Sequence, residues 1–249
     1  MFTMMYSTIR GDKDTSATTA RELLGVAERT LPSRYRMIVM LNCASALRRS
    51  GAVNESELVC ESLFHIAVPL RCFDLAAEAC NRLIEMHVDS GCPVDARRWV
   101  STYRALRRPK RELRSQRTLR IAIARVHVLD SEWDAAAQLL GTAPGNRLWE
   151  DSVLMLRSAA LATKIRVEIG RGTLPATLAP LVDELGILNQ SFRTVGAQDY
   201  ECYSLYLGYC YINESARAEG FLEQYVRRER RDNKPLAPEI AAEVARLAL

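Results

Sequence analysis

The stretch SEWDAAAQLL, Ser131–Leu140, predicts a tight turn followed by a helix that has small side chains near its start. Forty residues earlier the chain has GCPVDARRWV at Gly91–Val100, and forty before that GAVNESELVC at Gly51–Cys60. Extending this spacing predicts equivalent turns near five residues, in steps of 40 or 41: Gly51, Gly91, Ser131, Gly172 and Asn213. A fixed period of this size is typical of stacked helical arrays.

The residues after each turn support two helices per unit. A small residue follows five positions later, at Ser56, Ala96, Ala136, Thr177 and Ala218. Three positions further comes an apolar residue, at Val59, Trp99, Leu139 and Phe221, and Pro180 interrupts the pattern in the fourth unit. Paired helices approach closely only where side chains are short, so we expect the small residues at the crossing points.

Three segments complete the expected secondary structure. A leading helix is predicted at about Ser16–Leu31, and a final one at Ala237–Leu249. The segment Leu119–Leu129 alternates apolar and polar residues in places, as a strand does, but it also fits a helical stripe. Its position in the repeat favours a helix.

The pattern resembles the tetratricopeptide family of helical-hairpin repeats. Trp133 stands at the aromatic position of that family's turn and second helix, Ala136 at its small position, and Ser131 where Gly is usual. The repeat is longer than the family's roughly 34 residues, and in this it is similar to the sensory superhelices of some bacterial transcription activators. The resemblance implies an all-α fold: a right-handed α-solenoid of about five stacked hairpins with flanking helices. We expect a flexible N-terminus over residues 1–14 and a single repeat domain over 15–249.

Composition indicates the cellular compartment that we expect for the protein. The seven cysteines are odd in number and form no CxxC pair, which disfavours a disulfide framework or a zinc ribbon and favours a reducing compartment. The chain shows no secretory leader pattern and no run of roughly 20 apolar residues. We therefore expect a cytoplasmic protein without a membrane segment.

Sequence patterns of catalytic and metal sites are few. The chain has no P-loop, GxGxxG, HExxH or GxSxG pattern, so we expect neither enzymatic activity nor a cofactor. His87 and His127 both lie four residues before a turn, where the next units have Glu168 and Tyr209. Two imidazoles and a carboxylate are acceptable zinc or iron ligands. The alternative is a packing position that tolerates a medium-sized ring, and it is the preferred interpretation, so no metal is expected.

Candidate binding residues come partly from the resemblance, which implies that the first helix of each hairpin lines a concave groove. The corresponding positions are Asn81, Glu85, Arg125, Arg166 and Tyr203. Arg125 and Arg166 would be equivalent, and two guanidinium groups facing one groove suit a carboxylate or phosphate. The alternative is two solvated surface arginines.

The segment DYECYSLYLGYCYI supplies a second indication of binding. Its five tyrosines fall within twelve residues, more than one buried helix face can hold: Tyr200, Tyr203, Tyr206, Tyr209 and Tyr211. Interfaces favour tyrosine. Tyr200 therefore joins Tyr203 among the candidate partner-binding residues.

A basic run forms the third candidate surface. Its members are Arg107, Arg108, Lys110, Arg111, Arg114 and Arg117. The run lacks the aromatic residues that stack on bases, so nucleic acid is disfavoured. A solvated convex edge is the preferred interpretation, and an acidic protein surface is the second.

These features together predict a non-catalytic protein–protein interaction module that binds a peptide or partner protein, acidic in character, in the concave groove. The alternative is a ligand- or peptide-responsive regulatory domain of a transcription-control or signalling system. The apolar ending ARLAL allows a homo-oligomer through the C-terminal helix.

Overall fold

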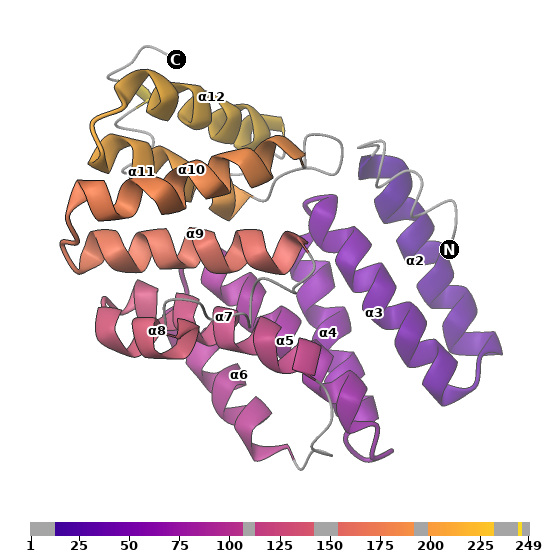
Figure 1. The fold of residues 1–249 in the computed structure, drawn as a ribbon. Coiled ribbons are helices and arrows are strands. Elements are labelled where there is room, and N and C mark those ends of the chain that lie inside the picture. The colour runs from indigo at the N-terminus through magenta and orange to yellow at the C-terminus, as the bar shows by residue number, and fades with distance from the viewer. Residues whose placement is uncertain (1–12, 107–112, 142–153, 192–198, 232–243, 246–249) are drawn as a thin grey trace. The chain divides into compact units, whose positions relative to one another are not determined.

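The chain is all-helical in the part that the computed structural model describes, residues 13–106, 113–141, 154–191, 199–231 and 244–245 (Figure 1). The predicted all-α class is confirmed, and Leu119–Leu129 belongs to a helix and not to a strand. The helices in chain order are α2 (Lys13–Thr30), α3 (Ser33–Arg49), α4 (Val53–Ala67), α5 (Phe73–Asp89), α6 (Pro93–Ala105), α7 (Leu113–Leu129), α8 (Trp133–Leu140), α9 (Leu154–Gly170), α10 (Pro175–Ser191), α11 (Asp199–Tyr211) and α12 (Ser215–Arg231).

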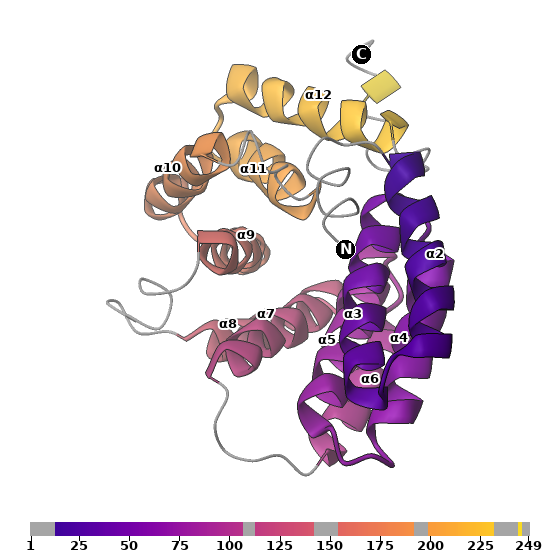
Figure 2. The ribbon, with the colours of Figure 1, turned by 90° about the vertical axis from the view of Figure 1, so that its right-hand side faces the viewer.

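Contacts divide the chain into two compact units, residues 1–126 and 127–249. In the first unit each helix from α2 to α6 packs on the next. In the second unit the same holds from α8 to α12, and α9 also packs on α11 (Figure 2). Each unit is thus a stack of consecutive antiparallel helices, as a solenoid requires. The single domain over 15–249, the right-handed course and the tetratricopeptide resemblance stay predictions.

The turns between helices share one geometry. All five predicted turn residues have a positive φ: Gly51 90°, Gly91 67°, Ser131 58°, Gly172 70° and Asn213 63°. Arg71, with φ 57°, forms a further turn midway between the first two. At Gly51 the N–H donates to the carbonyl of Arg48, and the next N–H, of Ala52, donates to Leu47.

The same pair of hydrogen bonds recurs at each of the six turns. It is the Schellman motif, which satisfies the last free carbonyls of a helix while the chain reverses. The predicted turn positions are therefore confirmed.

The predicted small residues lie where the helices cross, with one exception. Ser56, Ala96, Ala136 and Ala218 are all at most 2% exposed. The Ser56 hydroxyl donates to the carbonyl of Ala44 at 2.8 Å, so its polar group is satisfied inside the hairpin.

Thr177 is the exception, because it is exposed. The turn at Gly172 contains one more residue than the others, since α10 begins three positions after it rather than two. The extra residue shifts the register, and Leu178 is buried at the crossing instead. Pro180 lies inside α10 without ending it.

Each unit has its own apolar core. The core of the first unit includes Met37, Met40, Leu63, Ala67, Leu75, Ala76 and Ala79. The core of the second includes Ala162, Ile165, Leu178, Val182, Leu185, Leu205, Tyr209 and Ala218. No helix in the described ranges has the length and apolar character needed to cross a membrane.

The two ends of the chain are described only in part. The predicted leading helix is confirmed as α2. Residues 1–12 and most of the predicted final helix lie outside the described residues. Within that last segment Val244 is helical and packs against Leu222 and Val226 of α12.

Candidate functional site

Three of the sequence-predicted binding residues lie together in the second unit. The guanidinium group of Arg166, on α9, lies 4.9 Å from the ring centroid of Tyr200 and 5.2 Å from that of Tyr203, both on α11. These distances fall within the range of cation–π attraction. In the described part of the chain Arg166 makes no hydrogen bond or ion pair, so its N–H donors are available to a ligand.

The aromatic surface extends from α11 onto α12. Tyr203 stacks on Tyr206 with ring centroids 6.1 Å apart and planes 19° apart, and it contacts Tyr225 of α12 at 5.7 Å. Leu222 and Val226 are buried beneath these rings. All four tyrosines are half-buried. We call Arg166, Tyr200, Tyr203, Tyr206 and Tyr225 the tyrosine face.

Tyr209 has a different environment from the other tyrosines, because it belongs to the core. It is 4% exposed and its ring stacks on Phe221 at 5.5 Å, with planes 8° apart. Gly186 leaves room for its hydroxyl group, since a Cβ atom there would lie 2.8 Å from that oxygen. Burial, and then the nearby carboxylate of Asp183, raises the pKa of Tyr209. The side chain is thus a packing element of α11.

The candidates on the first unit lie in the packing between helices. Asn81 on α5 is 4% exposed, and Arg125 on α7 is 5% exposed. Glu85 forms an ion pair with Arg48 of α3 at 2.9 Å, and Arg48 also pairs with Asp89.

Burial alone would lower the pKa of Arg48, but the carboxylates of Asp89 and Glu85 raise it above its ordinary value. The guanidinium therefore stays charged and joins α3 to α5. Glu85 is occupied by this contact.

A common groove for these residues stays a prediction. Arg125 lies in the first unit and Arg166 in the second, and each unit is described by itself. The basic run at residues 107–117 contributes no observation, because its first four members lie outside the described residues and no side chain of the run is described.

Two residues of the alternative metal interpretation, His127 and Glu168, each contact the turn that follows their own helix. His127 accepts the backbone N–H of Glu132 at its carbonyl, and its Nδ1 lies 2.5 Å from the Glu132 carboxylate. Glu168 accepts the N–H of Thr173 at its carbonyl and the Thr173 hydroxyl at its carboxylate, at 2.5 Å. Among the described residues no group of three or more His, Cys, Asp or Glu side chains is placed to hold a metal ion.

His87, in the first unit, is buried, with its Nε2 3.4 Å from Glu57 of α4. The side chain four residues before a turn therefore packs against a neighbouring helix or contacts the turn itself.

Comparisons with protein-family models, with curated proteins and with solved structures gave no match. The functional argument therefore depends on the residues of this chain.

Two members of the tyrosine face were not among the predicted binding residues. Tyr206 belongs to the tyrosine-rich segment, but helical spacing does not place it on the side that Tyr200 and Tyr203 share. Tyr225 lies 22 positions after Tyr203, and only the packing of α12 against α11 brings the two rings together. The one sequence signal for Tyr225 is its position on the second helix of the predicted hairpin whose first helix carries Tyr203.

Proposed function

We propose that this chain is a non-catalytic binding module that recognises a peptide segment of a partner protein, with the tyrosine face as its contact surface. The observation that carries the proposal is the position of Arg166 over Tyr200 and Tyr203, together with the absence of a hydrogen bond or ion pair from Arg166 to any residue that the structure describes. The recognised segment carries a carboxylate, from Asp, Glu or a C-terminus. Arg166 binds this carboxylate.

The physical basis is preorganisation. The two rings hold the planar guanidinium group in place, so less side-chain entropy is lost on binding than for a freely moving arginine. Its N–H donors can then bind a carboxylate through two parallel hydrogen bonds. Tyr203, Tyr206 and Tyr225 add rigid apolar contact area. Tyrosine and arginine are among the residues that contribute most to protein–protein binding.

Selection from a random peptide library, displayed on phage and captured by the full chain, tests the proposal. We expect enrichment of peptides with acidic residues. The selected peptides should bind Arg166→Ala at least about tenfold more weakly, which corresponds to about 1.4 kcal/mol. Arg166→Lys should restore only part of the affinity, because an ammonium group lacks the planar fork.

Arg98→Ala is the matched control. Arg98 also lies over an aromatic ring, that of Trp99 at 5.3 Å, but it belongs to the first unit. Its removal should leave peptide affinity unchanged. The proposal fails if selected peptides bind Arg166→Ala as tightly as the wild type, provided that circular dichroism shows the variant to be folded.

A further inference from the structure

A second candidate site lies between α8 and α9, apart from the tyrosine face. A cavity of about 110 Å³ is lined there by Ala137, Leu140, Gly141, Lys164, Val167, Glu168 and Arg171. Lys164 and Arg166 are two positions apart, which places them about 200° apart around α9. The cavity and the tyrosine face therefore occupy different sides of the same helix.

The cavity lies along a short helix. α8 has eight residues, whereas α9 beside it has 17. Gly141 ends α8 with φ 86° and ψ 125°, a conformation that only glycine adopts without strain. Leu140, the last residue of α8, is buried against the cavity wall.

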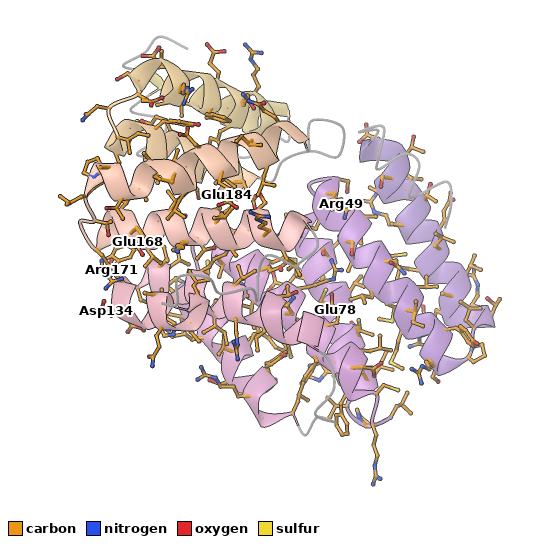
Figure 3. All side chains as sticks on the ribbon, viewed as in Figure 1. Arg49, Glu78, Asp134, Glu168, Arg171 and Glu184 are labelled. Atoms are coloured by element: carbon orange, nitrogen blue, oxygen red, sulfur yellow. The ribbon has the colours of Figure 1, made fainter. Side chains whose placement is uncertain are left out.

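Among the described residues, the charges around the cavity leave one cation, Lys164, without an anion. The carboxylate of Glu168 accepts the Thr173 hydroxyl and lies 3.9 Å from Arg171, and Arg171 lies 3.2 Å from the exposed carboxylate of Asp134. Figure 3 shows Asp134, Glu168 and Arg171 gathered at the end of α9.

Lys164 is half-buried, and it makes no hydrogen bond or ion pair in the part of the chain that the structure describes. The lining residues Lys164, Arg171 and Glu168 carry a net charge of +1 (two cations and one anion).

We propose that this cavity binds a small aliphatic monocarboxylate, whose carboxylate group pairs with Lys164 and whose hydrocarbon part contacts Ala137 and Leu140. The volume sets the size of the ligand, since a dry cavity of about 150 Å³ holds benzene. On that scale a cavity of about 110 Å³ accepts about four non-hydrogen atoms, which is enough for the hydrocarbon part of a short monocarboxylate whose carboxylate group lies beside Lys164. This site goes beyond the proposed peptide recognition. Its occupation favours the alternative function, a ligand-responsive regulatory domain.

Butyrate is the probe for the test, in a titration of the full chain followed by ¹H–¹⁵N NMR. We expect saturable shifts of amides in α8 and α9 with a dissociation constant on the order of 1 mM. The neutral analogue 1-butanol should bind at least about tenfold more weakly, because it offers Lys164 no charge. Lys164→Met keeps the apolar stem and removes the ammonium group, and it should weaken butyrate binding by about tenfold or more.

Two further variants make the result decisive. Ala137→Leu fills the cavity and keeps every charge, so it should also abolish binding. Arg166→Ala should bind butyrate as the wild type does, which separates this site from the peptide surface whatever the outcome there. The proposal is overturned if butyrate shows no saturable binding, or if Lys164→Met or Ala137→Leu binds it as tightly as the wild type.

Discussion

The first unit follows its repeat closely, whereas the second departs from it. Turns occur at Gly51, Arg71 and Gly91, a spacing of 20 residues. In the second unit α8 ends after eight residues, and the turn at Gly172 contains an extra one. The regular part shows what packing alone demands. The irregular part holds the tyrosine face and the α8–α9 cavity.

The charged side chains differ only in part, because ion pairs also join helices of the second unit, Arg157 with Glu184 and Arg217 with Asp183. In the first unit Arg48 binds two carboxylates of α5, so the charges there join helices. In the second unit Arg166 and Lys164 have no ion pair in the described residues. Natural proteins tend to break their own structural rules at functional sites. Arg166 and Lys164 are therefore the reason for which we propose binding in the second unit.

The largest expected effect is on the rate at which a buried cysteine is modified, and it tests the packing of the first unit. Burial raises the pKa of Cys60 from 9.0 to about 12, against the smaller opposing effects of Arg82 and Arg48. The difference of about three units lowers the thiolate fraction about 1,000-fold near neutral pH, and the thiolate is the nucleophile. Iodoacetamide should therefore modify exposed Cys92 far faster than Cys60, as mapped by mass spectrometry. Equal rates would contradict the buried position of Cys60.

The next effect tests how α8 is held against α9 in the second unit. A Cβ atom added at Gly170 would lie 2.3–2.5 Å from the ring of Trp133. Gly170→Ala should therefore force the indole out of place and lower the free energy of unfolding by about 2 kcal/mol, measured by urea denaturation.

Gly220→Ala, on α12, is the control. A Cβ atom there has no neighbour within 4 Å, so this variant should gain about 0.5–1 kcal/mol. Stabilisation by both changes would rule out the tight contact between Trp133 and Gly170.

A smaller effect is expected where charges join α3 to α5. Arg48→Met should lower the free energy of unfolding by about 1 kcal/mol, because it leaves Glu85 and Asp89 without their shared cation. The side chain of Arg48 is 26% exposed. Arg98, whose side chain is 60% exposed and lies 3.6 Å from Glu61, provides the comparison. Arg98→Met should have the smaller effect, and the reverse order would show that the α3–α5 ion pairs do not stabilise the unit.

The sequence predicted the turns because their geometry restricts residue type. Positive φ values favour Gly and Asn, and these residue types identify the turns at Gly51, Gly91, Gly172 and Asn213. The turn at Ser131 follows from the repeat spacing. Arg71 carried no such mark, so the turn between α4 and α5 was not assigned a position. Thr177 was placed wrongly because one extra residue in a turn rotates the next helix by about 100°.

The candidate site was predictable only where it depended on local spacing. Tyr200 and Tyr203 are three positions apart, so they share one side of α11, and the repeat placed Arg166 on the helix that packs against it. Tyr225 and the cavity depend on tertiary pairing and on where α8 ends. A repeating sequence pattern does not reveal which helices pair in space or where a helix ends early. Asn81 and Glu85 were chosen by the same register, but the structure gives them packing and ion-pair contacts.

The smallest expected effect comes from an exposed ion pair in the first unit. Arg21 of α2 donates two hydrogen bonds to Glu55 of α4, at 2.7 and 2.8 Å. The hydrogen bonds from Arg21 lower the pKa of Glu55 below its ordinary value. The stabilisation is therefore fully present above the unfolded-state pKa, about 4.3, and is lost as pH falls through the lower folded-state pKa.

Glu55→Gln should lower the melting temperature slightly at neutral pH, and the difference from wild type should vanish in strong acid. Glu22→Gln, on exposed α2 surface, should leave the melting temperature unchanged at both pH values. A pH-independent difference for Glu55→Gln would mean that the carboxylate charge contributes nothing, because such pairs are worth little when solvated. The first unit would then be held by its core and by Arg48 without help from its surface.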